Sequence, residues 1–350
     1  MKNFGKEIIS KFHRALFGAV LLLVLSASFV PEALAVTVTP KLELTADPGE
    51  TLQEVFKITN EERQSKTFYI TFENFHAVDE TGNPAFGGTP EDLATWISAP
   101  DSLTMGPGET KDIPITIRIP TTADPGGHFA AIFVQTDPPK NKEVAIASKL
   151  GTLVLLRVNG DFAQAANILE FGTKNKQYLF SSLPVYFYYR FQNTGADHQK
   201  PVGDVVITNM FGRTSKILPA NPETGSVLPK SIRRFETVWA NNSGNLEEEV
   251  NPTLPTPAGK GFWNATKYEL HNFAFGTYTA KLKVVFGTKA LQSANATTTF
   301  FVFPWHVLLI FIILLLLVFI VGKFGLRRYN RYIISTVQNQ SSARVRKLKK

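Results

Sequence analysis

The sequence predicts an all-β protein with two tandem immunoglobulin-like β-sandwich domains, followed by one C-terminal transmembrane helix. Three observations lead to this fold class. Apolar and polar residues alternate in short runs separated by Gly and Pro, and no amphipathic helices are evident between these runs, as a parallel α/β sheet would need. Near the C-terminus, a long apolar run is followed at once by basic residues.

Residues 1–35 are predicted to be a signal peptide. Basic residues precede an apolar stretch at Ala15–Phe29, and Ala33-Leu34-Ala35 has the small-x-small pattern of a signal peptidase site. We expect cleavage after Ala35. The alternative is an uncleaved second membrane anchor, which the short apolar stretch and the Ala-x-Ala pattern disfavour.

The first sandwich is expected at 36–160. Its alternating runs predict strands at Val36–Thr39, Lys41–Leu44, Lys66–Phe72, Ile113–Ile119 and His128–Val134. A short helix is expected at Thr89–Trp96, with Thr89 as its N-cap and Pro90 in its first turn. Trp96 is interpreted as a structural side chain and not as a ligand platform.

The second sandwich is expected at 161–302, after a break at Asn159-Gly160-Asp161. Strands are predicted at Val185–Phe191, Val205–Thr208 and Thr279–Phe286. The polar and Pro-rich character of Asn251–Pro257 predicts that 240–272 is a long surface loop.

The two halves repeat one pattern, which favours tandem copies of a sandwich. Each half has a strand that ends in Asn, a turn before a long strand, and a Gly-aromatic-Ala hairpin. In the first half these are Asn60, Pro107–Thr110 and Pro125–Ala131; in the second they are Asn193, Leu228–Ser231 and Phe275–Ala280.

The C-terminal apolar run, Phe300–Val321, is interpreted as the contact with the membrane. A transmembrane helix is predicted at 303–323, because a bilayer core needs about 20 apolar residues. The tail at 324–350 is predicted to be cytoplasmic. Together with Lys323 it carries nine Lys and Arg and no acid, which predicts a single-pass type I protein with an extracellular ectodomain. Trp305 and His306 are expected at the outer interface of the membrane.

Charge and cysteine content exclude some functions. The net charge of +8 comes from the tail and the signal peptide, so the exported part is slightly acidic and no nucleic-acid partner is expected. The chain has no Cys, which excludes disulfides, a thiol nucleophile and thiolate metal sites.

No catalytic, cofactor-binding or metal-ligating residue is predicted, and the binding residues are left unassigned. His76, His128, His198 and His271 occur singly, without the spacing of metal ligands. Asp79–Asn83 is interpreted as a turn in preference to a calcium loop, and Glu247–Glu249 as a solvated run. A hydrolase with two carboxylates close in space stays open as a less favoured alternative, because such a pair needs no sequence motif.

Part of the chain resembles a known family. The turns at Asp47–Glu50 and Pro107–Glu109, the strands that end at Asn60 and Pro120, and the segment Asp124–Phe129 resemble the first, immunoglobulin-like domain of WxL-interacting proteins. The resemblance covers 36–160 best and is weaker in the second domain. It implies a wall-associated surface protein of Gram-positive bacteria with a peptidoglycan-binding sandwich.

The predicted function is therefore non-catalytic binding at the cell surface, to cell-wall peptidoglycan or to a surface protein. The alternative is an accessory or assembly subunit. Its ectodomain would pair with a secreted or membrane protein by strand addition, as a chaperone does. An enzymatic ectodomain is the third hypothesis.

Overall fold

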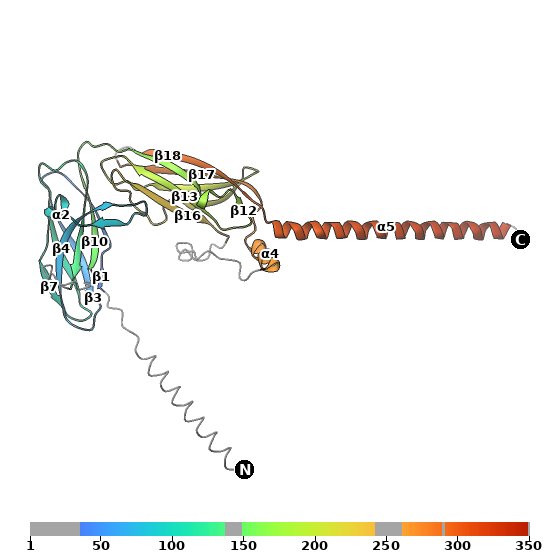
Figure 1. Cartoon of the computed structure of the whole chain (residues 1–350), viewed down its shortest axis with the longest axis horizontal. Helices are drawn as coiled ribbons and strands as arrows, with labels where there is room; N and C mark the ends of the chain where they lie inside the picture. Colours follow the sequence, from blue (N-terminus) through green and yellow to red (C-terminus); the bar gives the residue numbers. More distant parts are fainter. Residues whose placement is uncertain (1–35, 137–148, 242–260, 289–290, 349–350) are drawn as a thin grey trace, which may run out of the picture. The chain divides into compact units, whose positions relative to one another are not determined.

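A computed structural model describes residues 36–136, 149–241, 261–288 and 291–348 (Figure 1). The predicted signal peptide, the Pro-rich segment Asn251–Pro257 and the run Glu247–Glu249 lie outside these residues. The described chain forms two compact units. The first contains the residues up to Asn74, together with Gly87–Ala123 and Phe129–Leu156. The second contains Phe75–Phe86, Asp124–His128 and Arg157 onward.

The first unit is built on two facing β-sheets. One sheet has the strand order β1 (Val36–Val38), β3 (Thr51–Asn60), β8 (Thr110–Arg118) and β6 (Ile97–Ser98). The other has the order β2 (Lys41–Ala46), β10 (Lys149–Val158), β9 (Gly126–Gln135), β4 (Lys66–Ala77) and β5 (Pro84–Phe86), with β7 (Ser102–Met105) also paired to β4. Four parts of this sheet belong to the second unit: β5, the start of β9, and the last residues of β4 and β10. Alternate side chains of these strands point inward, and Phe56, Phe68, Met105, Ile115 and Ile132 are fully buried.

The second unit is also a sandwich. Its three-stranded sheet has the order β11 (Ala166–Thr173), β13 (Val185–Asn193) and β16 (Ile232–Trp239). Its five-stranded sheet has the order β12 (Leu179–Phe180), β18 (Gln292–Val302), β17 (Gly276–Phe286), β14 (Val202–Asn209) and β15 (Thr214–Pro219). Aromatic rings fill the space between the sheets: Phe300 lies 5.4 Å from Phe187, 5.6 Å from Tyr278 and 6.0 Å from Trp239, centroid to centroid.

The helical elements are few among the described residues. They are α2 (Leu93–Trp96), the 3-10 turn η1 (Lys174–Lys176), α4 (Phe262–His271) and α5 (Trp305–Leu348). Within the segment Trp305–Ile334 of α5, an 18-residue stretch has a mean hydropathy of 3.2 and is not buried against the rest of the chain, so the segment is long and apolar enough to cross a membrane. The all-β fold class, with two immunoglobulin-like sandwiches and a long apolar C-terminal helix, is confirmed.

The internal repeat is visible in the hydrogen bonds of the two strand-ending asparagines, both fully buried. Asn60 donates from Nδ2 to the carbonyls of Gly106 (2.8 Å) and Gln64 (3.0 Å), and its Oδ1 accepts from the Glu62 amide (3.1 Å). Asn193 donates from Nδ2 to the carbonyls of Val227 (2.9 Å) and Asp197 (2.7 Å), and its Oδ1 accepts from the Gly195 amide (2.9 Å). Partners thus lie at i+2 and i+4 and on a facing segment in both units. We call these arrangements the Asn60 corner and the Asn193 corner.

Three predictions are corrected. The membrane contact predicted at Phe300–Val321 begins too early, because Phe300 and Val302 are fully buried core residues of β18, and α5 begins only at Trp305. Part of the loop predicted at 240–272 is the helix α4. The helix predicted at Thr89–Trp96 begins at Leu93, so Thr89 is not its N-cap; Asp92 holds that position without a side-chain cap bond.

Candidate binding site

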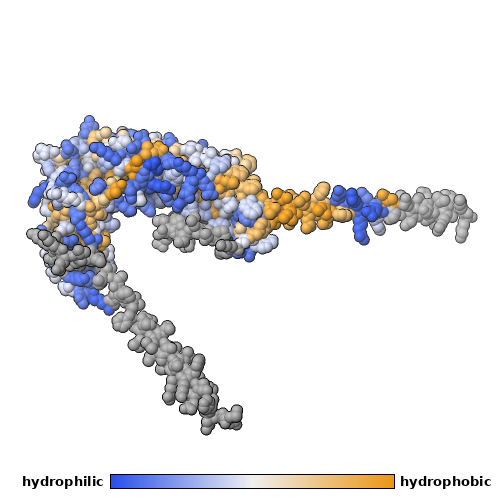
Figure 2. All heavy atoms as spheres, in the orientation of Figure 1, coloured by the Kyte–Doolittle hydropathy of each residue, from blue (hydrophilic) through white to orange (hydrophobic). Residues whose placement is uncertain are grey.

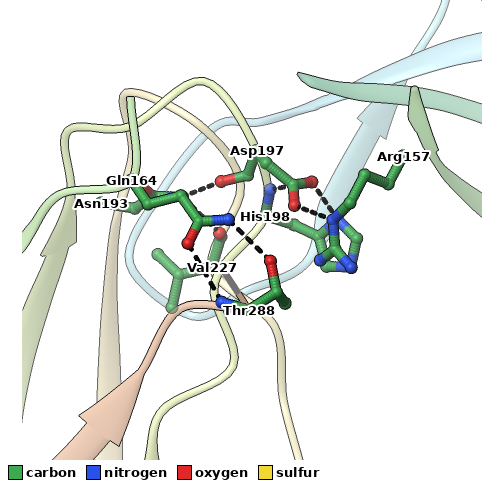
Figure 3. Close-up of polar contacts among 7 residues, drawn as sticks. All are labelled: Arg157, Gln164, Asn193, Asp197, His198, Val227 and Thr288. Carbon is green, nitrogen blue, oxygen red and sulfur yellow. Dashed lines mark hydrogen bonds and ion pairs between the residues drawn. The ribbon is translucent and has the colours of Figure 1, made fainter. Parts of the chain in front are cut away.

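A buried polar cluster in the second unit is the first candidate for a catalytic site (Figure 3). The Asp197 carboxylate is fully buried and pairs with the Arg157 guanidinium. Its Oδ1 also accepts from the His198 amide at 2.7 Å and lies 2.7 Å from His198 Nδ1. Burial acts to raise the pKa of Asp197, but His198 and Arg157 outweigh it and hold that pKa below its ordinary value.

The surroundings of this cluster are structural. Asp197 holds the loop to which Asn193 donates, and beside it Gln164 and Thr288 bond each other through Gln164 Nε2 to Thr288 Oγ1 (2.7 Å) and the Thr288 amide to Gln164 Oε1 (3.0 Å) (Figure 3). A general base must reach the proton that it takes, and both Asp197 oxygens are engaged by basic groups of the protein. The cluster therefore stabilises the fold and offers no free carboxylate for catalysis.

The outer face of the three-stranded sheet is a second candidate. Tyr186, Tyr188 and Arg190 of β13 alternate with Phe187 and Tyr189, which face the core, so the three side chains lie on the outer face, where Tyr188 is itself buried. Aromatic rings stack on sugar rings, and a guanidinium binds acidic groups, so this face has the chemistry of a binding surface.

The charges on this face are already satisfied within the second unit. Arg190 forms a bidentate pair with Glu80, with Nε 2.8 Å from Oε2, and this pairing lowers the pKa of Glu80. The Tyr188 hydroxyl donates to Glu170 at 2.7 Å, and the Arg234 guanidinium covers the Tyr188 ring at 4.0 Å. A ligand would have to displace these contacts, so we do not assign binding to this face.

The third candidate is an unpaired strand edge in the first unit. β3 pairs with β8 along Thr51–Thr59 but with β1 only at Ile58–Asn60. Within the described part of the chain, the backbone of Thr51–Lys57 therefore has no strand on its β1 side. We call Thr51–Lys57 the open edge.

The core beside the open edge is incompletely covered. Phe56 and Ile58 of β3 are fully buried, whereas Leu52 of the same inward-facing row is only half-buried. Only Thr39 and Pro40 separate β1 from β2, which places the edge strand β2 of the facing sheet on the same side of the sandwich. Its inward-facing Leu42 and Leu44 are also half-buried. The open edge thus combines unpaired backbone with leucines that a further strand would cover.

The residues singled out from the sequence are not brought together. His76 lies in β4, and His271 ends α4. The His128 ring nitrogen Nε2 lies 2.8 Å from the Asp124 carbonyl oxygen, and His198 belongs to the Asp197 cluster. Among the described residues, no group of His, Asp and Glu could hold a metal ion.

The segment Asp79–Asn83 forms the predicted turn. Asp79 Oδ1 accepts from the Thr81 amide at 2.9 Å and from its hydroxyl at 2.6 Å, which lowers the pKa of Asp79. Glu80 points to a different partner, Arg190. The two carboxylates therefore do not converge on a common point.

Comparisons with known proteins give structural similarity only. No protein-family model matches the chain, and no curated protein matches it. The class 5 fimbriae chaperone CfaA is similar over 76% of this chain and 99% of its own, at 10% identity and a TM-score of 0.36. The E. coli chaperone DraB is similar over 76% and 99%, at 11% identity and a TM-score of 0.32.

A PapD-like domain of human CEP192 is similar over 38% of this chain and 93% of its own, at 16% identity and a TM-score of 0.27. Two of these three structures are thus chaperones, and the third is a PapD-like domain. Identities and scores this low carry no functional inference to this chain.

Proposed function

We propose that this chain is a non-catalytic, membrane-anchored surface protein whose first sandwich binds a protein partner by strand addition at the open edge. The observation that carries the proposal is the unpaired backbone of Thr51–Lys57 beside the half-buried Leu52. A strand added there would pair its main chain with β3 and cover Leu42, Leu44 and Leu52 with its inward-facing side chains.

An open strand edge that binds no partner promotes aggregation. Exposed edges template aggregation, and proteins blunt them with charges, bulges or coverage. Here Lys57 pairs with Asp112 at 3.8 Å on the outer face, but it does not cover the leucines on the inner side. An edge left open beside apolar side chains is consistent with a partner that closes it.

The anchor supports a role at the cell surface. The apolar segment of α5 follows directly on the last strand of the second sandwich, and the residues after Gly322 are rich in Lys and Arg. Under the positive-inside rule the tail would stay in the cytoplasm and both sandwiches would face outward, as a single-pass type I protein.

Site-specific photo-crosslinking in intact cells tests the proposal. The full chain carries a photoreactive amino acid at Glu54, which shares the inward-facing side of β3 with Leu52, or at Val202, which is 64% exposed in the second unit. We expect an adduct with a discrete protein from Glu54 and little from Val202.

A matched pair of substitutions supplies the control. Leu52→Lys places a charge where the added strand would pack and should abolish the Glu54 adduct, whereas Val55→Lys, on the exposed side of the same strand, should leave it unchanged. Equal adducts from both label positions, or an adduct that survives Leu52→Lys, would disprove strand addition at this edge. Protease treatment of intact cells separately tests the orientation: it should digest the sandwiches and spare the tail.

Peptidoglycan binding is the second candidate function. The resemblance of residues 36–160 to WxL-interacting proteins favours it. Isolated cell wall should then sediment the full chain from detergent solution, and Leu52→Lys should not reduce this binding. Sedimentation without any protein adduct at Glu54 would favour wall binding over strand addition.

A further inference from the structure

One end of the second unit is rich in exposed apolar side chains. Phe211 is 78% exposed, Trp263 69%, Leu270 58% and Leu179 56%, while Phe275 and Phe303 are also exposed. Monomeric soluble proteins rarely gather such side chains in one region without a binding role. We call these six residues the apolar rim.

Strand pairing places the rim at the end of the sandwich from which α5 emerges. Leu179 pairs with Phe301, and Gly276, next to Phe275, pairs with Val302. Phe211 lies in the turn after Asn209, whose partner in β17 is Tyr278. Trp305, the first residue of α5, follows Val302 after only Phe303 and Pro304. Figure 2 shows the hydrophobic surface of this end running into that of α5.

The helix α4 is fastened to the first turn of α5 by a buried carboxylate. Glu269 Oε2 accepts from the backbone amides of His306 (3.0 Å) and Val307 (3.2 Å), and Glu269 Oε1 lies 2.6 Å from His306 Nδ1. Glu269 thus caps the N-terminus of α5 from a different helix, where its charge also favours the helix dipole. The Phe262 ring adds a contact with His306 at 5.2 Å. Because of these contacts, α4 stays at the start of the membrane-spanning segment.

The outward side of α4 has the character of an interfacial helix. Trp263, Lys267 and Leu270 recur at spacings of four and three residues and are exposed, whereas Thr266 and Glu269 on the other side are buried. Trp at such a position suits the boundary between headgroups and acyl chains, and a Lys can extend its amine to the phosphates.

We propose that the apolar rim and the outward side of α4 dock on the outer leaflet of the lipid bilayer, so that the second sandwich lies on the membrane. This inference depends on the proposed anchoring through α5. Its physical basis is continuity: α5 enters the bilayer within two residues of Phe303, and lipid is the apolar phase that the rim would then meet.

Depth-dependent fluorescence quenching in phosphatidylcholine vesicles tests this. The chain has no Cys, so one introduced cysteine gives a single labelling site for an environment-sensitive dye. Full-length protein is labelled at one of three positions. These are Asn264→Cys, next to Trp263 on α4, Leu314→Cys within α5, and Val202→Cys in β14. All three positions are exposed, and Val202 lies at the opposite end of the β14–β17 pair. Lipids carrying spin labels at known depths are the quenchers.

We expect the Leu314 label near the bilayer centre, the Asn264 label within about 5–10 Å of the headgroup boundary, and the Val202 label in water. Trp263→Ser with Leu270→Ser should move the Asn264 label into water and leave the Leu314 label in place. A Leu314 label in lipid with an aqueous Asn264 label in the otherwise unchanged chain would refute docking and keep the anchor. An aqueous Leu314 label would refute the anchor itself.

Discussion

Asn60 in the first unit and Asn193 in the second bond equivalent partners, but the acidic residues beside them differ. At the Asn60 corner, Glu62 pairs with Lys66 four residues later at 2.6 Å, and the Lys66 side chain is 32% exposed. At the Asn193 corner, Asp197 is fully buried and pairs with Arg157, distant in sequence. The basic partner of the acid is thus local in the first corner and distant in sequence in the second, so equal backbone geometry does not imply equal sensitivity to mutation.

The largest effects are expected from the asparagines themselves. Asn60→Ala and Asn193→Ala each remove the Nδ2 donor of one carbonyl, that of Gln64 or Asp197, and the Oδ1 acceptor of one amide, which should cost about 3 kcal/mol in the unit concerned. Native-state hydrogen exchange, read separately in β3 and β13, measures both. Similar losses of stability in the two units would support the structural equivalence of the corners, and a loss in only one unit would contradict it.

The neighbouring acids should differ more sharply. Asp197→Ala leaves the Arg157 guanidinium, which is only 19% exposed, without its carboxylate partner. This should lower the free energy of unfolding of the second unit by about 3 kcal/mol. Glu62→Ala removes the partner of Lys66, which is partly exposed and can be solvated, and should cost about 1 kcal/mol or less. The amides of β13 and β3 report the two values in the same exchange experiment. A Glu62 cost equal to that of Asp197 would contradict the distinction drawn above.

Acid should weaken the second unit through Asp197. Its pKa in the folded state lies below the ordinary value of 3.8, so its contribution is complete above that pH and is lost as the pH falls through the folded-state value. Hydrogen exchange in β13 should therefore show a loss of stability below about pH 4 that Asp197→Asn does not show. Identical profiles for the two proteins would remove Asp197 as the cause.

The smallest effect concerns Tyr189, which lies four residues before Asn193 as Phe56 lies four before Asn60. Both side chains are fully buried, but the Tyr189 hydroxyl has no hydrogen-bond partner among the described residues. Burial also raises the pKa of Tyr189. Tyr189→Phe should stabilise the second unit by up to about 1 kcal/mol, as a shift in the urea midpoint. A destabilisation would indicate that the hydroxyl has a partner in solution.

Much of the fold follows from local sequence pattern. The alternating runs at Ile113–Ile119, Val185–Phe191 and Thr279–Phe286 are the strands β8, β13 and β17, because a half-buried strand must alternate. The repeated strand-ending Asn also predicted a common feature, although its hydrogen-bond partners at Gly106 and Val227 could be identified only in three dimensions.

Other elements were missed for physical reasons. The sequence-based prediction includes the end of β18 in the membrane segment, because Phe300–Phe303 is as apolar as the helix that follows. Pro304 is the signal that marks the boundary, since it precedes the first turn of α5. The helix α4 has a glycine at its N-cap and no side-chain cap bond, so no start signal marks it. The open edge depends on which strands pair, and no local pattern encodes the absence of a neighbour.

The direct join between β18 and α5 also determines how the protein carries tension. If α5 anchors the chain as proposed, a force between the second sandwich and the bilayer enters at the C-terminal end of β18, because Phe303 and Pro304 are the whole connection. β18 is hydrogen-bonded to β17 from Gln292 to Val302 and to β12 at Phe301 and Val302. A force directed along β18 would meet all of the bonds to β17 at once, because they lie perpendicular to an antiparallel strand. The pairing of β18 would then hold the second sandwich folded under load.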